Sequence, residues 1–266
     1  MKINSDTRLI GLIGNPVGHS ISPSIHNSIY SYFGMNYLYA AFGVAPTSID
    51  KAVEGMVALS FVGFNVTIPY KQRILGLLDD VDQEASIIGA VNTVKINNGK
   101  LKGYNTDGMG FIDGLQRIGV RPNNSVIALL GAGGAARGIA AYLLKEGASR
   151  IYILNRTYQK GVDLANELNH EYSTNAIVPV DRAELNQLEL DLIVNTTSAG
   201  MHPHVEINPL EGFIFDPNTV VVDIIYNPTE TRLLRAAKEQ GCVTQNGIDM
   251  LIGQALASIK IWTGKE

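Results

Sequence analysis

The sequence predicts an α/β protein with two domains, and three observations lead to that prediction. Along most of the 266 residues, apolar runs short enough for strands alternate with segments of helical pattern, which is the signature of a layered α/β structure. Residues 125–157 read as a strand, a glycine turn, a helix and a second strand, which together form a βαβ unit. That unit begins only at residue 125, so the chain before it requires a sheet of its own.

The first 104 residues are expected to form a mixed sheet with helices packed on it. Asn98-Gly99 favours a tight turn, so residues 91–104 are expected to form a hairpin. Ser22-Pro23 has the residue types of a helix N-cap and first turn. Strands are expected at 9–13, 37–44 and 62–68, and helices at 22–33, 48–59, 70–78 and 83–88.

The rest of the chain continues the alternation around the βαβ unit. Strands are expected at 126–130, 151–154, 190–194, 220–225 and 242–244, and helices at 139–144, 157–168, 230–240 and 247–262. We expect residues 1–104 and 241–266 to form one discontinuous domain. Residues 105–240 are expected to form the other domain, with the fold of the nucleotide-binding α/β proteins.

The glycine turn of the βαβ unit has the spacing of a dinucleotide-binding loop. Gly131, Gly133 and Ala136 match the three small positions of that fingerprint. Gly131 permits the tight turn, and Gly133 lets a pyrophosphate approach the backbone. The following helix N-terminus offers N–H groups and partial positive charge to the phosphates. An ordinary βα turn without a ligand is the alternative.

The end of the second strand of the unit indicates which dinucleotide is bound. An NAD site usually has an acidic residue there, which accepts hydrogen bonds from the ribose. This chain has Asn155-Arg156-Thr157, followed by Lys160, and these cations can pair with a 2′-phosphate. We therefore expect NADP, although incidental charges at a solvated helix N-terminus would give the same pattern.

Composition excludes several classes of function. Apolar residues make up 45% of the chain and charged residues 17%, and the net charge is −4, so neither nucleic acid nor an anionic membrane is an expected partner. Cys242 is the only cysteine, which favours a reducing compartment and a cytoplasmic protein. No window is apolar enough to span a membrane. His202 and His204 lack a cluster of acidic neighbours, so no metal site is expected.

Several polar motifs outside the glycine turn are candidates for a substrate site, and each has an ordinary explanation. Ser20 and Ser22 could be helix caps, and Lys71 could be a solvated surface charge. Asp107, which precedes a helix, could be an N-cap. Singly, none of these residues predicts chemistry.

Taken together and in order, the motifs resemble the shikimate dehydrogenase family across residues 9–264. The matching stretches are Gly14-Asn15-Pro16 through Pro23, Phe64-Asn65-Val66-Thr67-Ile68-Pro69-Tyr70-Lys71, Gly89-Ala90-Val91-Asn92-Thr93, Gly103-Tyr104-Asn105-Thr106-Asp107-Gly108, Gly131-Ala132-Gly133-Gly134-Ala135, Asn155-Arg156-Thr157, Asn195-Thr196-Thr197-Ser198-Ala199-Gly200-Met201, Tyr226-Asn227-Pro228 and Asn246-Gly247-Ile248-Asp249-Met250. Many members carry one more short helix after the position of Gly264, and the motifs do not depend on it.

The resemblance implies an NADP-dependent reduction of 3-dehydroshikimate to shikimate, a step of aromatic amino-acid and chorismate biosynthesis. It also implies an N-terminal substrate domain and a Rossmann-like NADP domain, with a cleft between them. Carried over by position, the catalytic pair is Lys71 and Asp107. The substrate shell is Ser20, Ser22, Asn65, Thr67, Asn92, Tyr226 and Gln254. The cofactor shell is Gly131, Ala132, Gly133, Gly134, Ala135, Asn155, Arg156, Thr157, Lys160, Thr197, Ile224, Gly247 and Met250.

Three other functions stay open at this point. A relative within the family could accept quinate or use NAD. An S-adenosylmethionine methyltransferase also uses such a glycine turn, but Asn155-Arg156 disfavours it because those enzymes usually have an acid there. An NADP-binding regulator without activity is the third, and the presence of both Lys71 and Asp107 argues against it. The family contains monomers and dimers, so a homodimer is one assembly to expect.

Overall fold

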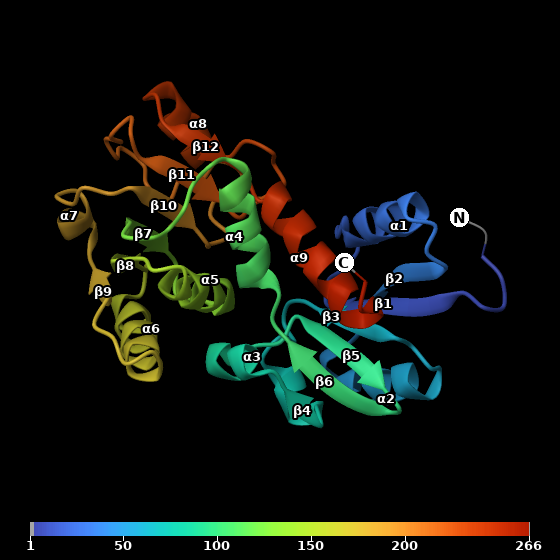
Figure 1. Ribbon diagram of the computed structural model, residues 1–266. Coiled ribbons are helices and arrows are strands. Elements are labelled where there is room, and N and C mark those ends of the chain that lie inside the picture. The colour runs from blue at the N-terminus through green and yellow to red at the C-terminus, as the bar shows by residue number, and fades with distance from the viewer. Residues whose placement is uncertain (1–2, 266) are drawn as a thin grey trace. The chain divides into compact units, whose positions relative to one another are not determined.

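The computed structural model describes residues 3–265, and the chain folds into two compact units (Figure 1). Unit 1 contains the chain up to Thr106 and again from Ile252 onward, and unit 2 contains Asp107–Leu251. Residues 1, 2 and 266, which are predicted to belong to the first domain, lie outside the described residues.

Unit 1 is built on a mixed six-stranded sheet. Its strands are β1 (Arg8–Gly14), β2 (Tyr37–Gly43), β3 (Gly63–Val66), β4 (Asp80–Val81), β5 (Thr93–Asn97) and β6 (Lys100–Tyr104), in the order β2-β1-β3-β5-β6-β4. β1 is parallel to β2 and β3, whereas β5 is antiparallel to β3 and β6. The β5–β6 turn confirms the predicted hairpin, because Asn98 and Gly99 both have positive φ angles.

Helices cover both faces of this sheet, as the alternation of side chains along β1 requires. The helices are α1 (Ser22–Tyr32), α2 (Ile49–Ala58), α3 (Gln83–Ile88) and the part of α9 (Ile248–Thr263) that follows Leu251; short 3-10 turns occur at Pro46–Ser48 and Arg73–Leu77. Ile13 packs in one apolar cluster with residues of α2. Ile10 and Leu12 point the other way and pack with Tyr30 of α1 and Trp262 of α9.

The same alternation decides where the polar residue of β3 points. Phe64 and Val66 pack in the cluster that contains α2, so Gly63 and Asn65 face the side of α9. A Cβ atom on Gly63 would lie 2.4 Å from Nε1 of Trp262, so this position must be glycine. Asn65 is thereby placed in a tightly packed region beside α9.

Unit 2 is a doubly wound parallel sheet. Its strands are β7 (Val126–Leu130), β8 (Arg150–Leu154), β9 (Ile177–Val180), β10 (Leu192–Asn195), β11 (Val220–Asp223) and β12 (Val243–Gln245), in the order β12-β11-β10-β7-β8-β9. Its helices are α4 (Asp107–Arg117), α5 (Gly134–Lys145), α6 (Tyr158–Glu171), α7 (Arg182–Leu185) and α8 (Arg232–Glu239), together with the start of α9. The chain runs outward from β7 to β9 and then returns to β10 beside β7, so the strand order reverses between β7 and β10.

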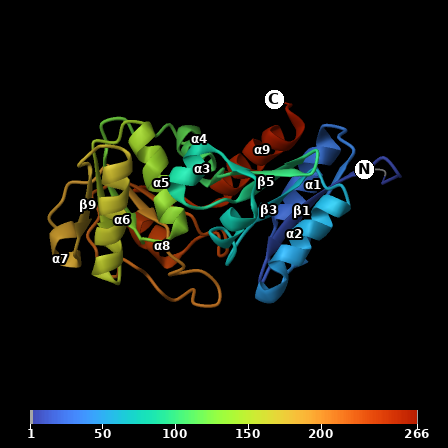
Figure 2. The same ribbon diagram turned by 90° about the horizontal axis from the view of Figure 1, so that it is seen from below.

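Alternate residues of the unit 2 strands pack against different helices. Gly161 of α6 lies against Ile153 of β8, and Figure 2 shows α5 and α6 side by side. Tyr152 and Leu154 of the same strand belong to a cluster with residues of α7 and α8. Both faces of the sheet are therefore covered, as expected for parallel strands.

Three local predictions were wrong. The N-cap of α1 is Ile21 rather than Ser22, because the serine has already entered the helix. The segment predicted as a helix at 70–78 contains only a 3-10 turn, because the chain is extended again at Leu78. Residues 241–251 fall in unit 2 rather than with the first domain, because β12 pairs with β11. The short elements β4, β9 and α7 were not predicted.

A buried carboxylate ties together the ends of two central strands of unit 2. Asn195 ends β10, Asp223 ends β11, and the two residues are paired in the register. Asp223 accepts hydrogen bonds from Asn195 Nδ2 (3.1 Å), the Ile225 amide (3.0 Å) and Thr231 Oγ1 (2.8 Å). Its side chain is fully buried, and burial, only partly offset by these donors, raises its pKa from 3.8 to about 6.

This pKa gives Asp223 a defined effect on stability. Below pH 3.8 the folded and unfolded chains both hold the proton. As the pH rises from there through about 6, the unfolded chain releases the proton first, so the free energy of unfolding falls. The total loss expected from a shift of this size is roughly 3 kcal/mol.

The variant Asp223→Asn tests this expectation. Asparagine does not ionise, and it keeps an oxygen for Asn195 and Ile225 while its NH2 group can donate to Thr231 Oγ1. Urea unfolding at several pH values from about 4 to about 7 should show the wild type losing stability relative to the variant as the pH rises. A difference between the two proteins that stays constant with pH would contradict the role assigned to Asp223.

Candidate functional site

The glycine turn at the carboxyl end of β7 has the geometry that the fingerprint predicts. Gly131 has a φ of +113°, and a Cβ atom there would lie 2.7 Å from Thr196 Oγ1. The Gly131 amide donates to the Leu154 carbonyl (2.8 Å), which fixes the turn against β8. Only glycine can occupy this position without strain and a clash.

The next two glycines lie open to solvent at the start of α5. A Cβ atom on Gly133 or Gly134 would meet nothing within 4 Å, and Ala132 and Ala135 are half-buried beside them. Gly133 is the N-cap of α5 and supplies no side chain to its first amides. Open space in front of uncapped helical N–H groups fits a pyrophosphate.

A cavity of about 1020 Å³ lies beyond the carboxyl ends of β7 and β8 in unit 2. Three predicted cofactor residues line it, namely Asn155, Arg156 and Thr197. Most of the lining was not predicted from the sequence: Tyr158, Asp181, Arg182, Ser198, Ala199, His204, Ile207, Asn208 and Glu211. These residues come from separate segments of unit 2, and only Ser198 and Ala199 lie in one of the matching motif stretches.

Arginine side chains give this cavity the character of a phosphate site. Arg156 is exposed at its rim, and Arg182 is held by a hydrogen bond from Nη2 to the Glu211 carbonyl (3.0 Å). The Arg182 guanidinium also lies 5.3 Å from the centroid of the Phe213 ring. The donor set fits an adenosine bearing a 2′-phosphate, because guanidinium groups pair with phosphate oxygens.

Thr157 and Lys160, which are predicted for the adenosine side of the cofactor, are exposed and do not line this cavity. Thr157 is the N-cap of α6, and its carbonyl accepts from Asn155 Nδ2 (2.8 Å). Lys160 follows in the first turn of α6 and is exposed. Both lie within a few residues of Arg156, on the same helix N-terminus.

Three residues predicted to lie beside the nicotinamide meet at the ends of β10 and β11. Asn195 Oδ1 accepts from both the amide (3.0 Å) and Oγ1 (2.7 Å) of Thr197, and the Asn195 carbonyl accepts from the Ile224 amide (3.1 Å). A Cβ atom on Gly247 would lie 2.0 Å from the Ile224 carbonyl oxygen, so glycine is required there. The fourth residue, Met250, is half-buried in the first turn of α9.

In unit 1, the predicted substrate residues Asn65, Asn92 and Gln254 belong to one buried polar network. Asn65 Nδ2 donates to the Asn92 carbonyl (3.0 Å) and to Ser258 Oγ (3.2 Å). Ser258 Oγ donates in turn to the Gln254 carbonyl (2.9 Å). The Asn92 side chain is fixed by Thr106, whose amide donates to Asn92 Oδ1 (2.9 Å).

The other predicted residues of unit 1 occupy the loops after β1 and β3 and the first position of α1. Ser20 Oγ donates to Ser22 Oγ (3.1 Å) and accepts from the Ser22 amide (3.3 Å), so the two hydroxyls lie side by side. Thr67 and Lys71 are half-buried after β3. The Thr67 amide donates to the Ile13 carbonyl (2.9 Å), and the Lys71 carbonyl accepts from the Val91 amide (2.8 Å).

Of the predicted catalytic and substrate residues, two belong to unit 2. Asp107 is the first residue of α4 and is buried, with 8% of its surface exposed. Tyr226 follows β11 and is half-buried, and burial raises the pKa of its phenol. Lys71 and Asp107, the predicted catalytic pair, are thus contributed by different units.

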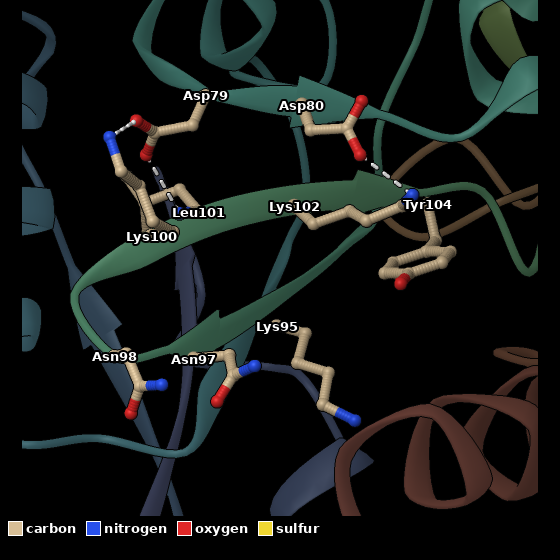
Figure 3. A pocket seen from close by; sticks show the side chains of 9 residues that line it. All are labelled: Asp79, Asp80, Lys95, Asn97, Asn98, Lys100, Leu101, Lys102 and Tyr104. Carbon is tan, nitrogen blue, oxygen red and sulfur yellow. Dashed lines mark hydrogen bonds and ion pairs between the residues drawn. The ribbon is translucent and has the colours of Figure 1, made fainter.

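A second hollow, of about 660 Å³, lies beside the β5–β6 hairpin of unit 1 (Figure 3). Its charged side chains are paired with one another: Lys100 with Asp79 and Lys102 with Asp80, each at 2.7 Å. Lys95 Nζ donates to the Ile261 carbonyl (2.7 Å). None of the predicted site residues lines this hollow, so it is not the candidate site.

The described part of the chain offers neither a membrane span nor a metal cluster. Between residues 3 and 265, no helix is both long and apolar enough to cross a membrane. Within the same range, no group of three or more His, Cys, Asp or Glu side chains is arranged to hold a metal ion.

Comparisons with known proteins agree with the division into two units. Residues 12–94 match the family described as "Shikimate dehydrogenase substrate binding domain". Residues 115–230 match the family described as "Shikimate / quinate 5-dehydrogenase". The two matches fall in unit 1 and unit 2 respectively.

Individual relatives cover nearly the whole chain. A shikimate dehydrogenase (NADP(+)) of Bacillus mycoides is 46% identical over 97% of this chain and 93% of its own. A shikimate dehydrogenase solved in complex with NADP+ is 42% identical, with a TM-score of 0.94 over 100% of this chain and 93% of that one. A shikimate 5-dehydrogenase from Listeria monocytogenes, solved with shikimate and NAD, is 35% identical, with a TM-score of 0.93 over 100% of this chain and 95% of that one.

The family resemblance seen in the motifs is therefore confirmed along the full chain. Both domain matches are present in the order of the motifs, and identity to relatives reaches 46%. This chain belongs to the shikimate dehydrogenase family.

Proposed function

We propose that this protein is an NADP-dependent oxidoreductase that interconverts 3-dehydroshikimate and shikimate, a step of aromatic amino-acid biosynthesis. The observation that carries the proposal is the 42% identity, over the whole chain, to a shikimate dehydrogenase solved with NADP+. The open glycine turn and the arginine-lined cavity support the same cofactor. A small polyol acid as substrate agrees with the hydroxyl and amide side chains of the predicted substrate shell.

The substrate roles are assigned to residues of the matching motifs. Ser20, Ser22, Asn65, Thr67, Asn92, Tyr226 and Gln254 are proposed to bind the carboxylate and hydroxyl groups of the substrate. Ser20, just before α1, and Ser22, its first residue, lie side by side and can donate to one anionic group. The amides of Asn65 and Asn92 are held in fixed orientations, which suits recognition of hydroxyl groups at defined positions.

The cofactor roles are assigned to residues of the matching motifs in unit 2. Gly131, Ala132, Gly133, Gly134 and Ala135 are proposed to hold the pyrophosphate, and Asn155, Arg156, Thr157 and Lys160 the adenosine side with its 2′-phosphate. Thr197, Ile224, Gly247 and Met250 are proposed to contact the nicotinamide side. When bound in its reduced form, NADP supplies a hydride to the ketone carbon.

A residue of the chain itself is proposed to donate the proton to the substrate oxygen and to accept it in the reverse reaction. As the ketone carbon gains the hydride, its oxygen gains negative charge and must receive a proton. Lys71 is proposed to donate that proton, and its positive charge stabilises the oxygen before transfer. Asp107 is proposed as the second member of the catalytic pair. In the reverse direction Lys71 must be neutral to accept the hydroxyl proton.

Two further statements about the protein stay predictions. The single cysteine, Cys242, is buried and its thiol donates to the Asp216 carbonyl (3.2 Å), in keeping with a cytoplasmic protein. A homodimer is one of the two assemblies expected for this family.

The activity itself is tested by absorbance at the band of the reduced nicotinamide. With shikimate and NADP the purified protein should produce NADPH, because the proposed reaction is reversible. The same assay with quinate and with NAD measures specificity, and kcat/KM should be greatest for shikimate with NADP. Absence of NADPH formation from shikimate, in a protein that binds NADP, would contradict the proposal.

The variant Lys71→Met tests the proton donor. The loss of a positioned acid–base group should lower kcat by roughly 10²- to 10⁴-fold while KM changes little. Lys51→Met, at an exposed position of α2, is the matched control. A variant that keeps the wild-type kcat would exclude Lys71 as the acid–base group.

The variant Arg156→Gln tests cofactor choice. A guanidinium that pairs with the 2′-phosphate should contribute to NADP binding only, so KM for NADP should rise roughly 10- to 100-fold while KM for NAD stays near its wild-type value. Arg150→Gln is the control, because Arg150 lies at the opposite end of β8 and donates to the Asn175 carbonyl (2.9 Å). Equal increases for both cofactors would argue against pairing with the 2′-phosphate.

A further inference from the structure

The side-chain amide of Asn65 has more hydrogen-bond acceptors within reach than it has hydrogens to donate. Asn65 is buried, and its Nδ2 has three acceptors within reach: the Asn92 carbonyl (3.0 Å), Thr93 Oγ1 (2.9 Å) and Ser258 Oγ (3.2 Å). An amide nitrogen carries only two hydrogens. Both donors of Asn65 are therefore committed inside unit 1.

The Asn92 carbonyl decides which way the Asn65 amide faces. A backbone carbonyl can only accept, so the NH2 group of Asn65 must lie on that side. The Oδ1 atom consequently faces the opposite side, where Tyr39 Oη lies at 2.7 Å. Since Oδ1 can only accept, the Tyr39 hydroxyl must be the donor of this bond.

Tyr39 is itself held rigidly in that role. Asn27 bonds both the amide and the carbonyl of Tyr39, each at 2.9 Å. The Tyr39 ring stacks on His26 with 4.0 Å between ring centroids and 7° between planes. Burial raises the pKa of the Tyr39 phenol well above its ordinary value, so its proton is present at every physiological pH.

His26 supports this arrangement as a neutral ring. It is fully buried, and burial lowers its pKa to about 3. Its Nε2 is the one buried side-chain nitrogen or oxygen between residues 3 and 265 without a hydrogen-bond partner. Its second ring nitrogen, Nδ1, lies 3.4 Å from Tyr30 Oη. His26 therefore acts as a flat surface that keeps the Tyr39 ring in place.

With these bonds made, one hydrogen-bonding position of the Asn65 amide stays open. Both hydrogens of Nδ2 are engaged, and Tyr39 occupies one of the two lone pairs of Oδ1. The second lone pair of Oδ1 can only accept a hydrogen. A ligand that contacts this amide must therefore present a donor, and a hydroxyl group is the donor that a polyol acid offers.

We propose that Tyr39 is a positioning residue of the substrate site, which holds Asn65 so that it meets the substrate only as the acceptor of a hydroxyl hydrogen. This inference rests on the proposed function, since it takes Asn65 to be part of the substrate shell. It assigns to Asn65 the recognition of one hydroxyl of the substrate rather than of its carboxylate, because a carboxylate has no hydrogen to donate.

Tyr39→Phe is the variant that tests the inference, with Tyr30→Phe as its matched control. Both tyrosines are buried in the same cluster, and each substitution deletes one buried hydroxyl. Only the Tyr39 hydroxyl contacts Asn65. Tyr39→Phe should raise KM for shikimate roughly tenfold, because Oδ1 loses its donor and the amide is released, with kcat and KM for NADP near wild type. Tyr30→Phe should leave all three values within about twofold.

The outcomes separate this inference from the proposed function. A wild-type protein without activity toward shikimate would contradict the proposed function, whatever the variants do. An active wild type whose KM for shikimate is unchanged by Tyr39→Phe, or is raised equally by Tyr30→Phe, would overturn the inference alone. KM for NADP and the thermal unfolding midpoint of each variant report whether the protein is intact.

If Tyr39→Phe does not yield folded protein, the double variant Thr93→Val, Ser258→Ala replaces it. This variant removes both hydroxyl acceptors of Asn65 Nδ2 while the Asn92 carbonyl stays in place. KM for shikimate should then stay near its wild-type value, with KM for NADP unchanged, because the Asn92 carbonyl and the Tyr39 hydroxyl still hold the amide. A tenfold rise in KM for shikimate would overturn the inference, because the two hydroxyl acceptors rather than Tyr39 would then hold Asn65.

Discussion

The structure depends on one constraint: polar side chains buried on or at the ends of strands must find hydrogen-bond partners inside the protein. Asn65 on β3 meets it through Tyr39, Thr93 and Ser258. Asp223 at the end of β11 meets it through Asn195 and Thr231. Because these partners come from distant parts of the sequence, satisfying the constraint also fixes the loops that follow the strands. The same bonds therefore stabilise each unit and orient the groups proposed to bind ligands.

Much of the fold could be predicted because its signals are local. The apolar run 126–130 is β7 as predicted, and Asn98-Gly99 alone identifies the β5–β6 turn. The errors occur where tertiary contacts, rather than the local sequence, determine the structure. The position of residues 241–251 depends on pairing between β12 and β11, which no local pattern encodes. β9 and α7 are short elements whose sequences carry too little periodicity to be recognised.

The residues of the candidate site also fall into two groups, those that could be predicted from the sequence and those that could not. Gly131, Asn155 and Arg156 could be predicted because their spacing along one βαβ unit has a physical meaning. Arg182, Asp223 and Tyr39 could not, because each acts on a residue far from it in sequence. The one available signal for Asp223 was an acid at the end of an apolar strand, and the roles of Arg182 and Tyr39 have no equivalent signal. Motifs thus indicated which residues are proposed to meet the ligands, and the structure adds residues that hold them in place.

The central claim is that a hydride passes between NADP and the ring carbon of the substrate while the protein supplies the proton. The most direct measurement is the fate of the label when 3-dehydroshikimate is reduced with NADPH that carries deuterium at both C4 positions. Mass spectrometry of the product should show shikimate that contains a single deuterium on carbon, even in ordinary water. Unlabelled shikimate, or deuterium recovered in the solvent, would contradict the account.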